Sequence, residues 1–134
     1  MNALPIEEIT LKRQLQYSDV FPLAFAAKEP SLELADVREW IQENKGRLLE
    51  QLSQHGAILF RGLPVNSDVD FDSVIRSFGL KNFTYAESLS NAVRRNRTER
   101  VFTANEAPAS VSIYLHHEMA QTPIYPSKLF FYCE

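Results

Sequence analysis

The sequence predicts an α+β domain in which two helices flank one buried strand and a long loop precedes the remaining strands. Three observations favour this class: two stretches with the apolar period of an amphipathic helix, a short apolar run between them, and strand-like segments near the C-terminus. Because the helices do not alternate with most of the strands, we expect them at one end of a mostly antiparallel sheet. The 134 residues are expected to form one domain or part of one, with residues 1–33 as a poorly defined N-terminal arm holding one short strand.

The first predicted helix begins near Leu34 and ends at Gly56. Its apolar residues recur with a period of 3.6 residues along one stripe, which contains Leu34, Val37, Ile41, Leu48 and Leu52. Asp36 and Glu39 have the spacing of a capping box, although a start nearer Ser31 also fits the pattern. Gly56 is suited to the left-handed conformation that commonly ends a helix.

A strand and a second helix follow directly. The run from Ala57 to Phe60 is continuously apolar, and we expect this strand to be buried on both faces. The second helix starts at Ser67 or Asp68, and Gly79 closes it. Its apolar residues have the spacing i, i+3, i+4 and i+7 of a single helical face, which contains Phe71, Val74, Ile75 and Phe78.

The last part of the chain is predicted to contain a loop and then strands. Residues 80–110 are mostly loop, with a short strand at Val101–Thr103. An alternating strand begins at Ser112, and a last strand covers Leu129–Cys133 after a turn near Pro123–Pro126. The single cysteine, Cys133, excludes an intramolecular disulfide, and its apolar neighbours predict a buried thiol.

Composition and charge exclude several classes of protein. Hydrophobic residues make up 45% of the chain and charged residues 23%, which is typical of a globular protein and argues against disorder. A net charge of -3 does not indicate a nucleic-acid-binding surface. No apolar run approaches the roughly 20 residues of a membrane helix, and the first ten residues lack the basic region of a signal peptide. We therefore expect a soluble, cytoplasmic protein with neither nucleic-acid nor membrane partners.

One motif indicates metal chemistry. His116 and Glu118 are an imidazole and a carboxylate two residues apart, and on a strand such side chains point to the same face. They could hold two positions around one divalent metal, and a site of two histidines and one carboxylate suits non-haem Fe(II). The alternative is a surface strand end whose polar side chains face water. His117 would point the other way, so we expect it to support a ligand or face substrate.

The other polar groups carry weaker predictions. His55 stands at the end of the first predicted helix, where a structural role is favoured over metal ligation. The four arginines between Arg94 and Arg100 could capture a carboxylate or phosphate, or they could form a solvated loop, and both readings stay open. The chain has no nucleophile elbow and no glycine-rich phosphate loop. The metal ligands are therefore the only catalytic residues that we predict.

Taken together, these segments resemble the TauD/TfdA-type Fe(II)- and 2-oxoglutarate-dependent dioxygenases, and more closely the branch of clavaminate synthase-like and syringomycin-biosynthesis-type hydroxylases. The resemblance covers roughly residues 35–134. Its ordered series of segments is more specific than the His-x-Glu step alone. The segments are His55–Gly62, Phe71–Gly79, Thr103–Pro108, Leu115–Ala120 and Leu129–Glu134.

The resemblance implies the N-terminal portion of a double-stranded β-helix, or jelly roll, with flanking helices and a barrel that is incomplete in this chain. It implies that His116 and Glu118 match the first two Fe(II) ligands, and that Asn105, Glu106 and His117 lie near the substrate. Reactions of this family use O₂ and 2-oxoglutarate as co-substrates to hydroxylate or desaturate a small molecule.

In the family, the distal histidine and the arginine that binds 2-oxoglutarate belong to a part that would follow Glu134. The Arg94–Arg100 cluster does not match that arginine. We therefore expect an incomplete site in this chain alone, and a second chain or a homodimer that completes the barrel and covers its strand edges. Two alternatives stay open: a non-catalytic remnant that serves as a binding or interaction module, and a non-redox, cupin-like metal-binding protein.

Overall fold

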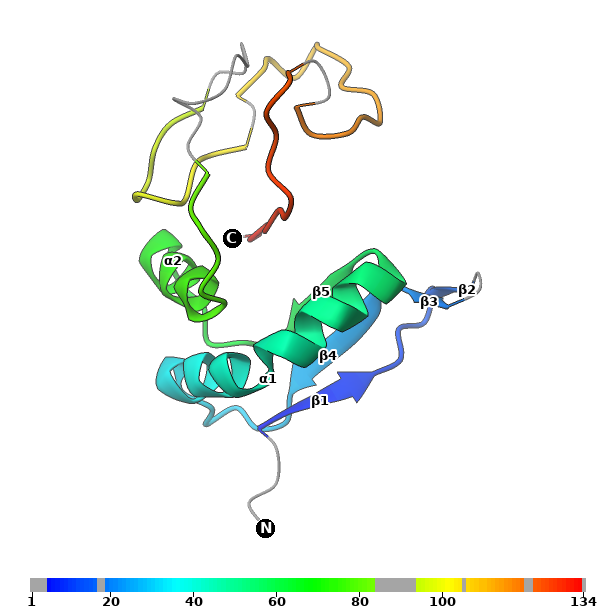
Figure 1. Cartoon of the computed structure of the whole chain (residues 1–134), viewed down its shortest axis with the longest axis vertical. Helices are drawn as coiled ribbons and strands as arrows, with labels where there is room; N and C mark the ends of the chain where they lie inside the picture. The colour runs from blue at the N-terminus through cyan, green and yellow to red at the C-terminus, as the bar shows by residue number, and fades with distance from the viewer. Residues whose placement is uncertain (1–4, 17–18, 84–93, 105, 120–121, 134) are drawn as a thin grey trace.

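The structure is a computed structural model that describes residues 5–16, 19–83, 94–104, 106–119 and 122–133. The described residues confirm the α+β class and form five strands and two helices (Figure 1). In chain order, the elements are β1 (Ile6–Ile9), β2 (Leu15–Gln16), β3 (Val20–Phe21), β4 (Leu23–Ala27), α1 (Leu34–His55), β5 (Ile58–Arg61) and α2 (Asp68–Ser77).

The main sheet is mixed, with the strand order β1-β4-β5. In the central strand, Ala24 pairs with Ile9 of the antiparallel β1 and with Leu59 of the parallel β5. A parallel neighbour requires a long crossover, and α1 provides it between β4 and β5. The prediction of a mostly antiparallel sheet is therefore wrong for this part of the fold, where one pairing of each kind occurs. Strands β2 and β3 form a separate two-stranded ladder.

The N-terminal region contains more structure than the single strand predicted for it. Four strands lie between Ile6 and Ala27, and β4 is the most buried of the strands whose burial the structure describes. Its apolar residues do not alternate with polar ones: Leu23 and Phe25 belong to the core that packs against α1, and Ala24 between them is also buried. Strand β5, predicted to be buried on both faces, is only half-buried. Its one pairing partner in the described part of the chain is β4.

Both predicted helices are confirmed, with small shifts at their ends. The N-cap of α1 is Glu33, whose backbone N–H donates to the Asp36 carboxylate at 3.0 Å, so the capping interaction lies three residues before the predicted one. At its other end Gly56 has φ 75° and donates to the Leu52 carbonyl. Helix α2 begins after Ser67, whose hydroxyl accepts from the Asp70 N–H at 3.1 Å. Within the described residues, neither helix has the length and apolar character needed to cross a membrane.

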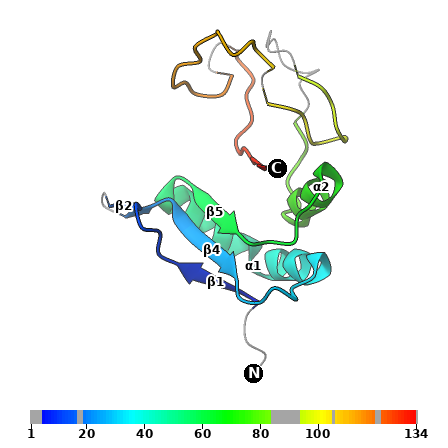
Figure 2. The same cartoon turned by 180° about the vertical axis from the view of Figure 1, so that it is seen from behind.

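The hydrophobic core lies between α1 and the sheet, and α1 covers one face of that sheet in both views (Figures 1 and 2). Phe25 of β4 is its centre, with ring centroids 5.9 Å from Trp40 of α1 and 5.7 Å from Phe60 of β5. Helix α2 packs on α1 and adds Val74 and Phe78 to this core. The core therefore forms a base from which the later part of the chain extends.

The strands predicted after residue 100 do not form in the described residues. Around Phe102 there is only one isolated bridge, to Asn96, and residues 112–115 and 129–133 pair with no strand. Residues 129–133 nevertheless show the alternation of an extended segment: Phe130 packs on Phe78, Tyr132 stacks on Phe71, and Phe131 is exposed. Cys133 lies on the exposed side of this alternation, so the prediction of a buried thiol is wrong.

Gly46 offers a direct test of α1. It lies inside the helix and is exposed, and a Cβ added there would meet no atom within 4 Å. We expect Gly46→Ala to raise the free energy of unfolding by about 0.5–1 kcal/mol, because alanine loses less backbone entropy in a helix. Urea denaturation measures the change. Gly56→Ala should lower stability, because φ is 75° at that position. A loss of stability in Gly46→Ala would contradict a continuous α1.

Candidate metal centre

His116 and Glu118 lie close together although their segment is not a strand. The His116 Nε2 atom is 3.8 Å from the Glu118 Oε2 atom. The other ring nitrogen of His116, Nδ1, lies 2.7 Å from the Tyr114 carbonyl oxygen. Because a carbonyl can only accept a hydrogen bond, Nδ1 carries the proton and donates, which in the neutral ring leaves Nε2 with a lone pair. The predicted proximity of the two side chains is therefore present, on an irregular backbone.

This arrangement suits a cation between the two side chains. A lone pair on His116 Nε2 and the Glu118 Oε2 atom are both acceptors, so only a proton or a metal ion can bridge them. Metal-binding histidines usually donate their second ring N–H to a carbonyl or carboxylate, as His116 does. Two ligands at about 2.1 Å from one ion and at right angles lie about 3 Å apart. The residues therefore fit two positions around a divalent metal after a movement of less than about 1 Å.

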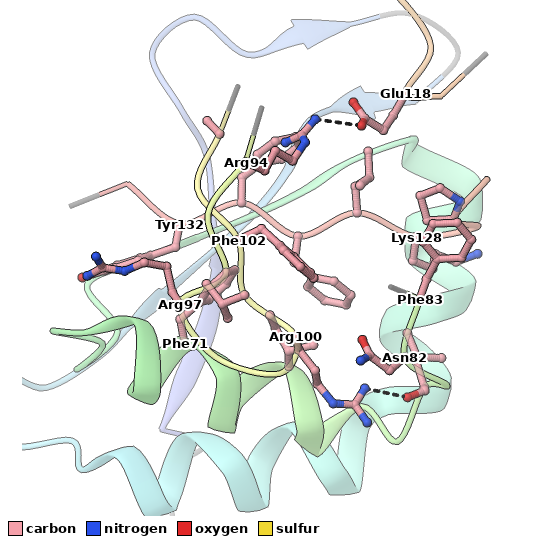
Figure 3. Close-up of a pocket in the computed structure, with 18 of the residues that line it drawn as sticks. Phe71, Asn82, Phe83, Arg94, Arg97, Arg100, Phe102, Glu118, Lys128 and Tyr132 are labelled. Atoms are coloured by element: carbon pink, nitrogen blue, oxygen red, sulfur yellow. Dashed lines mark hydrogen bonds and ion pairs between the residues drawn. The ribbon is translucent and has the colours of Figure 1, made fainter. Parts of the chain in front are cut away.

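Arg94 contacts the other oxygen of the same carboxylate. Its Nη2 atom donates to Glu118 Oε1 at 3.0 Å, and both side chains are only 17% exposed. Figure 3 shows this bond at one end of the cavity. The two oxygens of Glu118 thus have different neighbours: Oε1 accepts from Arg94, and Oε2 lies toward His116. The ion pair joins residues 24 positions apart in the chain.

The backbone directly after Glu118 adopts an uncommon conformation. Met119 has φ 59°, the left-handed region that residues other than glycine seldom occupy. Its side chain is buried, and its carbonyl accepts from both the N–H and the hydroxyl of Thr122, each at 2.9 Å. Such conformations persist where surrounding contacts hold them, and they cluster at functional sites. This turn fixes the backbone from which Glu118 extends.

The other predicted site residues that the structure describes contact different groups. The His117 ring packs edge-to-face on Tyr125, with centroids 5.4 Å apart. The Glu106 carboxylate forms an ion pair with Arg95 at 3.0 Å. Asn105 lies outside the described residues. His55 has the structural position that was predicted, because its Nδ1 lies 2.8 Å from the Val20 carbonyl and joins the end of α1 to β3.

The arginine cluster is engaged with groups of the chain itself. Arg100 donates to the Leu80 carbonyl at 3.1 Å, as Figure 3 shows. The other three arginines each form an ion pair with a carboxylate, in the pairs Arg94–Glu118, Arg95–Glu106 and Arg97–Asp68. The contacts of Arg97 and Arg100 tie the loop to α2 and to the segment that follows it. These contacts are internal to the chain, and the two readings, capture of a carboxylate or phosphate and a solvated loop, stay predictions.

Asp72 of α2 provides a second anchor for this loop. Its buried carboxylate accepts from Arg76 Nε at 2.6 Å and from the Thr98 hydroxyl at 3.1 Å. The hydrogen bonds to Asp72 and, secondarily, Glu99 raise the pKa of Arg76 above its usual value. The loop that carries Arg94 therefore has a defined position over α2.

A cavity of about 1080 Å³ lies between α2, this loop and the C-terminal segment. Its walls include the aromatic residue Phe130. Phe71, Phe102, Glu118 and Arg94 also line it (Figure 3). A cavity of this size has room for a small organic molecule. Among the residues that the structure describes, no group of three or more histidine, cysteine, aspartate or glutamate side chains comes together. The described residues thus bring together two of the predicted metal ligands, His116 and Glu118.

An α+β base that carries a candidate pair of metal ligands beside an aromatic cavity is consistent with a metal-dependent oxidoreductase. Residues 19–134 match the family model described as "Taurine catabolism dioxygenase TauD, TfdA family", and the chain belongs to this family. The resemblance predicted from the ordered segments is therefore confirmed. The jelly-roll barrel of the family is not formed by the described residues, which contain the mixed sheet and two helices.

Two relatives are similar to this chain. A clavaminate synthase-like protein of Arabidopsis thaliana is 41% identical over 140 residues, which cover 100% of this chain and 42% of that protein. The dapdiamide synthesis protein DdaC of Enterobacter agglomerans is 35% identical over 83 residues, which cover 62% of this chain and 25% of that protein. The chain thus spans less than half the length of these relatives.

Sequence reasoning did not find the contact between Arg94 and Glu118. The available signal was an arginine-rich loop in the same chain as a possible metal motif. Nothing in the spacing selects Arg94 from its three neighbouring arginines, because the pairing depends on how the loop folds over α2.

Proposed function

We propose that this chain carries part of the metal centre of an Fe(II)- and 2-oxoglutarate-dependent dioxygenase that hydroxylates or desaturates a small molecule. The observation that carries the proposal is the position of the His116 Nε2 atom, 3.8 Å from Glu118 Oε2, with Nδ1 2.7 Å from the Tyr114 carbonyl oxygen. Membership of the TauD/TfdA family supports it.

Each residue of the pair has a defined part in this proposal. His116 would bind the metal through Nε2 and Glu118 through Oε2, while the Tyr114 carbonyl keeps His116 in the required tautomer. Bound Fe(II) would hold O₂ and 2-oxoglutarate and supply the oxidising chemistry. The second histidine and the arginine that binds 2-oxoglutarate would come from outside the described residues, in a longer polypeptide or a second chain.

The cavity beside Glu118 is the proposed place for the substrate. Its aromatic walls suit the apolar part of a small molecule, and Glu118 brings the metal to its edge. Asn105, Glu106 and His117 are proposed to contact the substrate. Within the chain, the Glu106 carboxylate contacts Arg95 and the His117 ring contacts Tyr125.

Anaerobic spectroscopy tests this proposal. We expect the chain with Fe(II) to develop a weak visible charge-transfer band when 2-oxoglutarate is added, and His116→Ala to weaken or abolish it. His55→Gln serves as a matched control, because His55 contacts the Val20 carbonyl far from the pair in sequence. Binding of Zn(II) by His116 and Glu118 without any 2-oxoglutarate-dependent band would instead favour a non-redox metal-binding protein. Failure to bind any divalent metal would favour a non-catalytic interaction module.

A further inference from the structure

We infer that Arg94 is a positioning residue of the metal centre: it holds Glu118 Oε1 and so presents Oε2 to the ion shared with His116. This inference rests on the proposed function. It follows from the different neighbours of the two Glu118 oxygens: Arg94 donates to Oε1 at 3.0 Å, and His116 Nε2 lies 3.8 Å from Oε2.

The position of Arg94 is itself well determined. The neighbouring residue Arg95 exchanges two hydrogen bonds with Thr103, one from the Arg95 N–H to the Thr103 hydroxyl and one from the Thr103 N–H to the Arg95 carbonyl, each at 2.9 Å. The same loop is anchored on Asp72 through Thr98. Arg94 and Glu118 are each 17% exposed, so water competes weakly for their bond.

The bond determines how the carboxylate can bind a metal. With Oε1 accepting from Arg94 and Oε2 lying toward His116, a metal shared with His116 would bind through Oε2. Glu118 would then be a monodentate ligand and would leave one more coordination position for a co-substrate. Without Arg94, both oxygens could bind the ion, or the side chain could turn away from His116. Arg94 and the metal contact different oxygens, and the two interactions can therefore coexist.

Charge and orientation have opposite effects on metal affinity. The Arg94 guanidinium repels a nearby cation, which lowers affinity. Its hydrogen bond holds the ligand in place, which raises affinity, and the loss of such an outer partner typically weakens metal binding by about 10- to 100-fold. We therefore expect orientation to dominate, and the sign of the measured change decides between the two effects.

The experiment compares Zn(II) binding by the intact chain with that of Arg94→Gln, Arg94→Lys and Arg95→Gln, using competition calorimetry. We expect affinity to fall about 10- to 100-fold in Arg94→Gln and to recover partly in Arg94→Lys. Arg95→Gln is the matched control: Arg95 is the adjacent cation, is 77% exposed and pairs with Glu106. Its affinity should be unchanged.

Infrared difference spectra provide a readout that a purely structural role would not change. The separation of the two carboxylate stretching bands is larger for a monodentate ligand than for a bidentate one. We expect a large separation in the Zn(II)-loaded parent chain and a smaller one in Arg94→Gln. If Arg94→Gln does not fold, as judged by circular dichroism, Arg94→Lys gives the same comparison, because lysine keeps the charge but loses the guanidinium geometry.

The outcomes separate the inference from the proposed function. Equal or tighter Zn(II) binding in Arg94→Gln, with unchanged carboxylate bands, would overturn the role of Arg94 while the parent chain still bound metal. An absence of metal binding in the parent chain would overturn the proposed function and, with it, this inference.

Discussion

His116→Ala and Glu118→Ala are each expected to weaken Zn(II) binding by more than about 100-fold. Each substitution removes one of the two proposed ligand atoms, and the effect should therefore exceed the roughly 10- to 100-fold loss typical of an outer-shell partner. Glu118→Gln should also bind weakly, because its neutral amide preserves size but not charge. Competition calorimetry measures all three affinities in the intact chain.

His55→Gln is the matched control for these variants. His55 ends α1 and contacts the Val20 carbonyl at 2.8 Å, so its replacement should leave Zn(II) affinity within about twofold of the parent value, well below the effect of even an outer-shell partner. Similar losses in His55→Gln and His116→Ala would show that metal binds without using the proposed pair.

Phe25→Ala is expected to lower the free energy of unfolding by about 3–5 kcal/mol, the typical cost of a large cavity in a core. Phe25 is 2% exposed and packs between the rings of Trp40 and Phe60. A loss of this size is comparable to the whole stability of many domains. Urea denaturation followed by tryptophan fluorescence measures it, because the single tryptophan lies in this cluster.

Phe131→Ala provides the matched comparison for the core variant. The Phe131 side chain belongs to the same residue type but is 84% exposed, and its removal should change stability by less than about 0.5 kcal/mol. Comparable losses at the two positions would contradict the assignment of the core to the interface of α1 and the sheet.

The predicted elements that proved correct are those whose signal is local. Helices α1 and α2 and strand β5 follow from apolar period, capping residues and glycines within a few positions of one another. One short strand without bounds was predicted in the N-terminal arm, and the position of β4 was not predicted, because its pairing and burial depend on β1, β5 and α1, which lie elsewhere in the chain. The strands predicted at 112–115 and 129–133 have suitable residues, but strands also need pairing partners, and the described residues supply none.

The candidate site also combines features with a local sequence signal and features that depend on the rest of the fold. The proximity of His116 and Glu118 follows from their spacing of two residues, which brings the side chains together even without a strand. The tautomer of His116 and the partner of Glu118 depend on the Tyr114 carbonyl and on Arg94. The contact of His116 with the Tyr114 carbonyl depends on the local backbone geometry, and the contact of Glu118 with Arg94 is long-range. Neither can be read from a spacing rule.

The central claim is that His116 Nε2 and Glu118 Oε2 share one divalent cation. Long-range proton–nitrogen NMR spectra of the imidazoles test it most directly, because the chain has only three histidines to assign. Before metal is added, His116 should show the tautomer protonated at Nδ1, in agreement with its 2.7 Å contact to the Tyr114 carbonyl. Added Zn(II) should then shift Nε2 of His116 and leave the nitrogens of His55 and His117 unchanged. A shift at His117 or His55 instead, or none at His116, would contradict the claim.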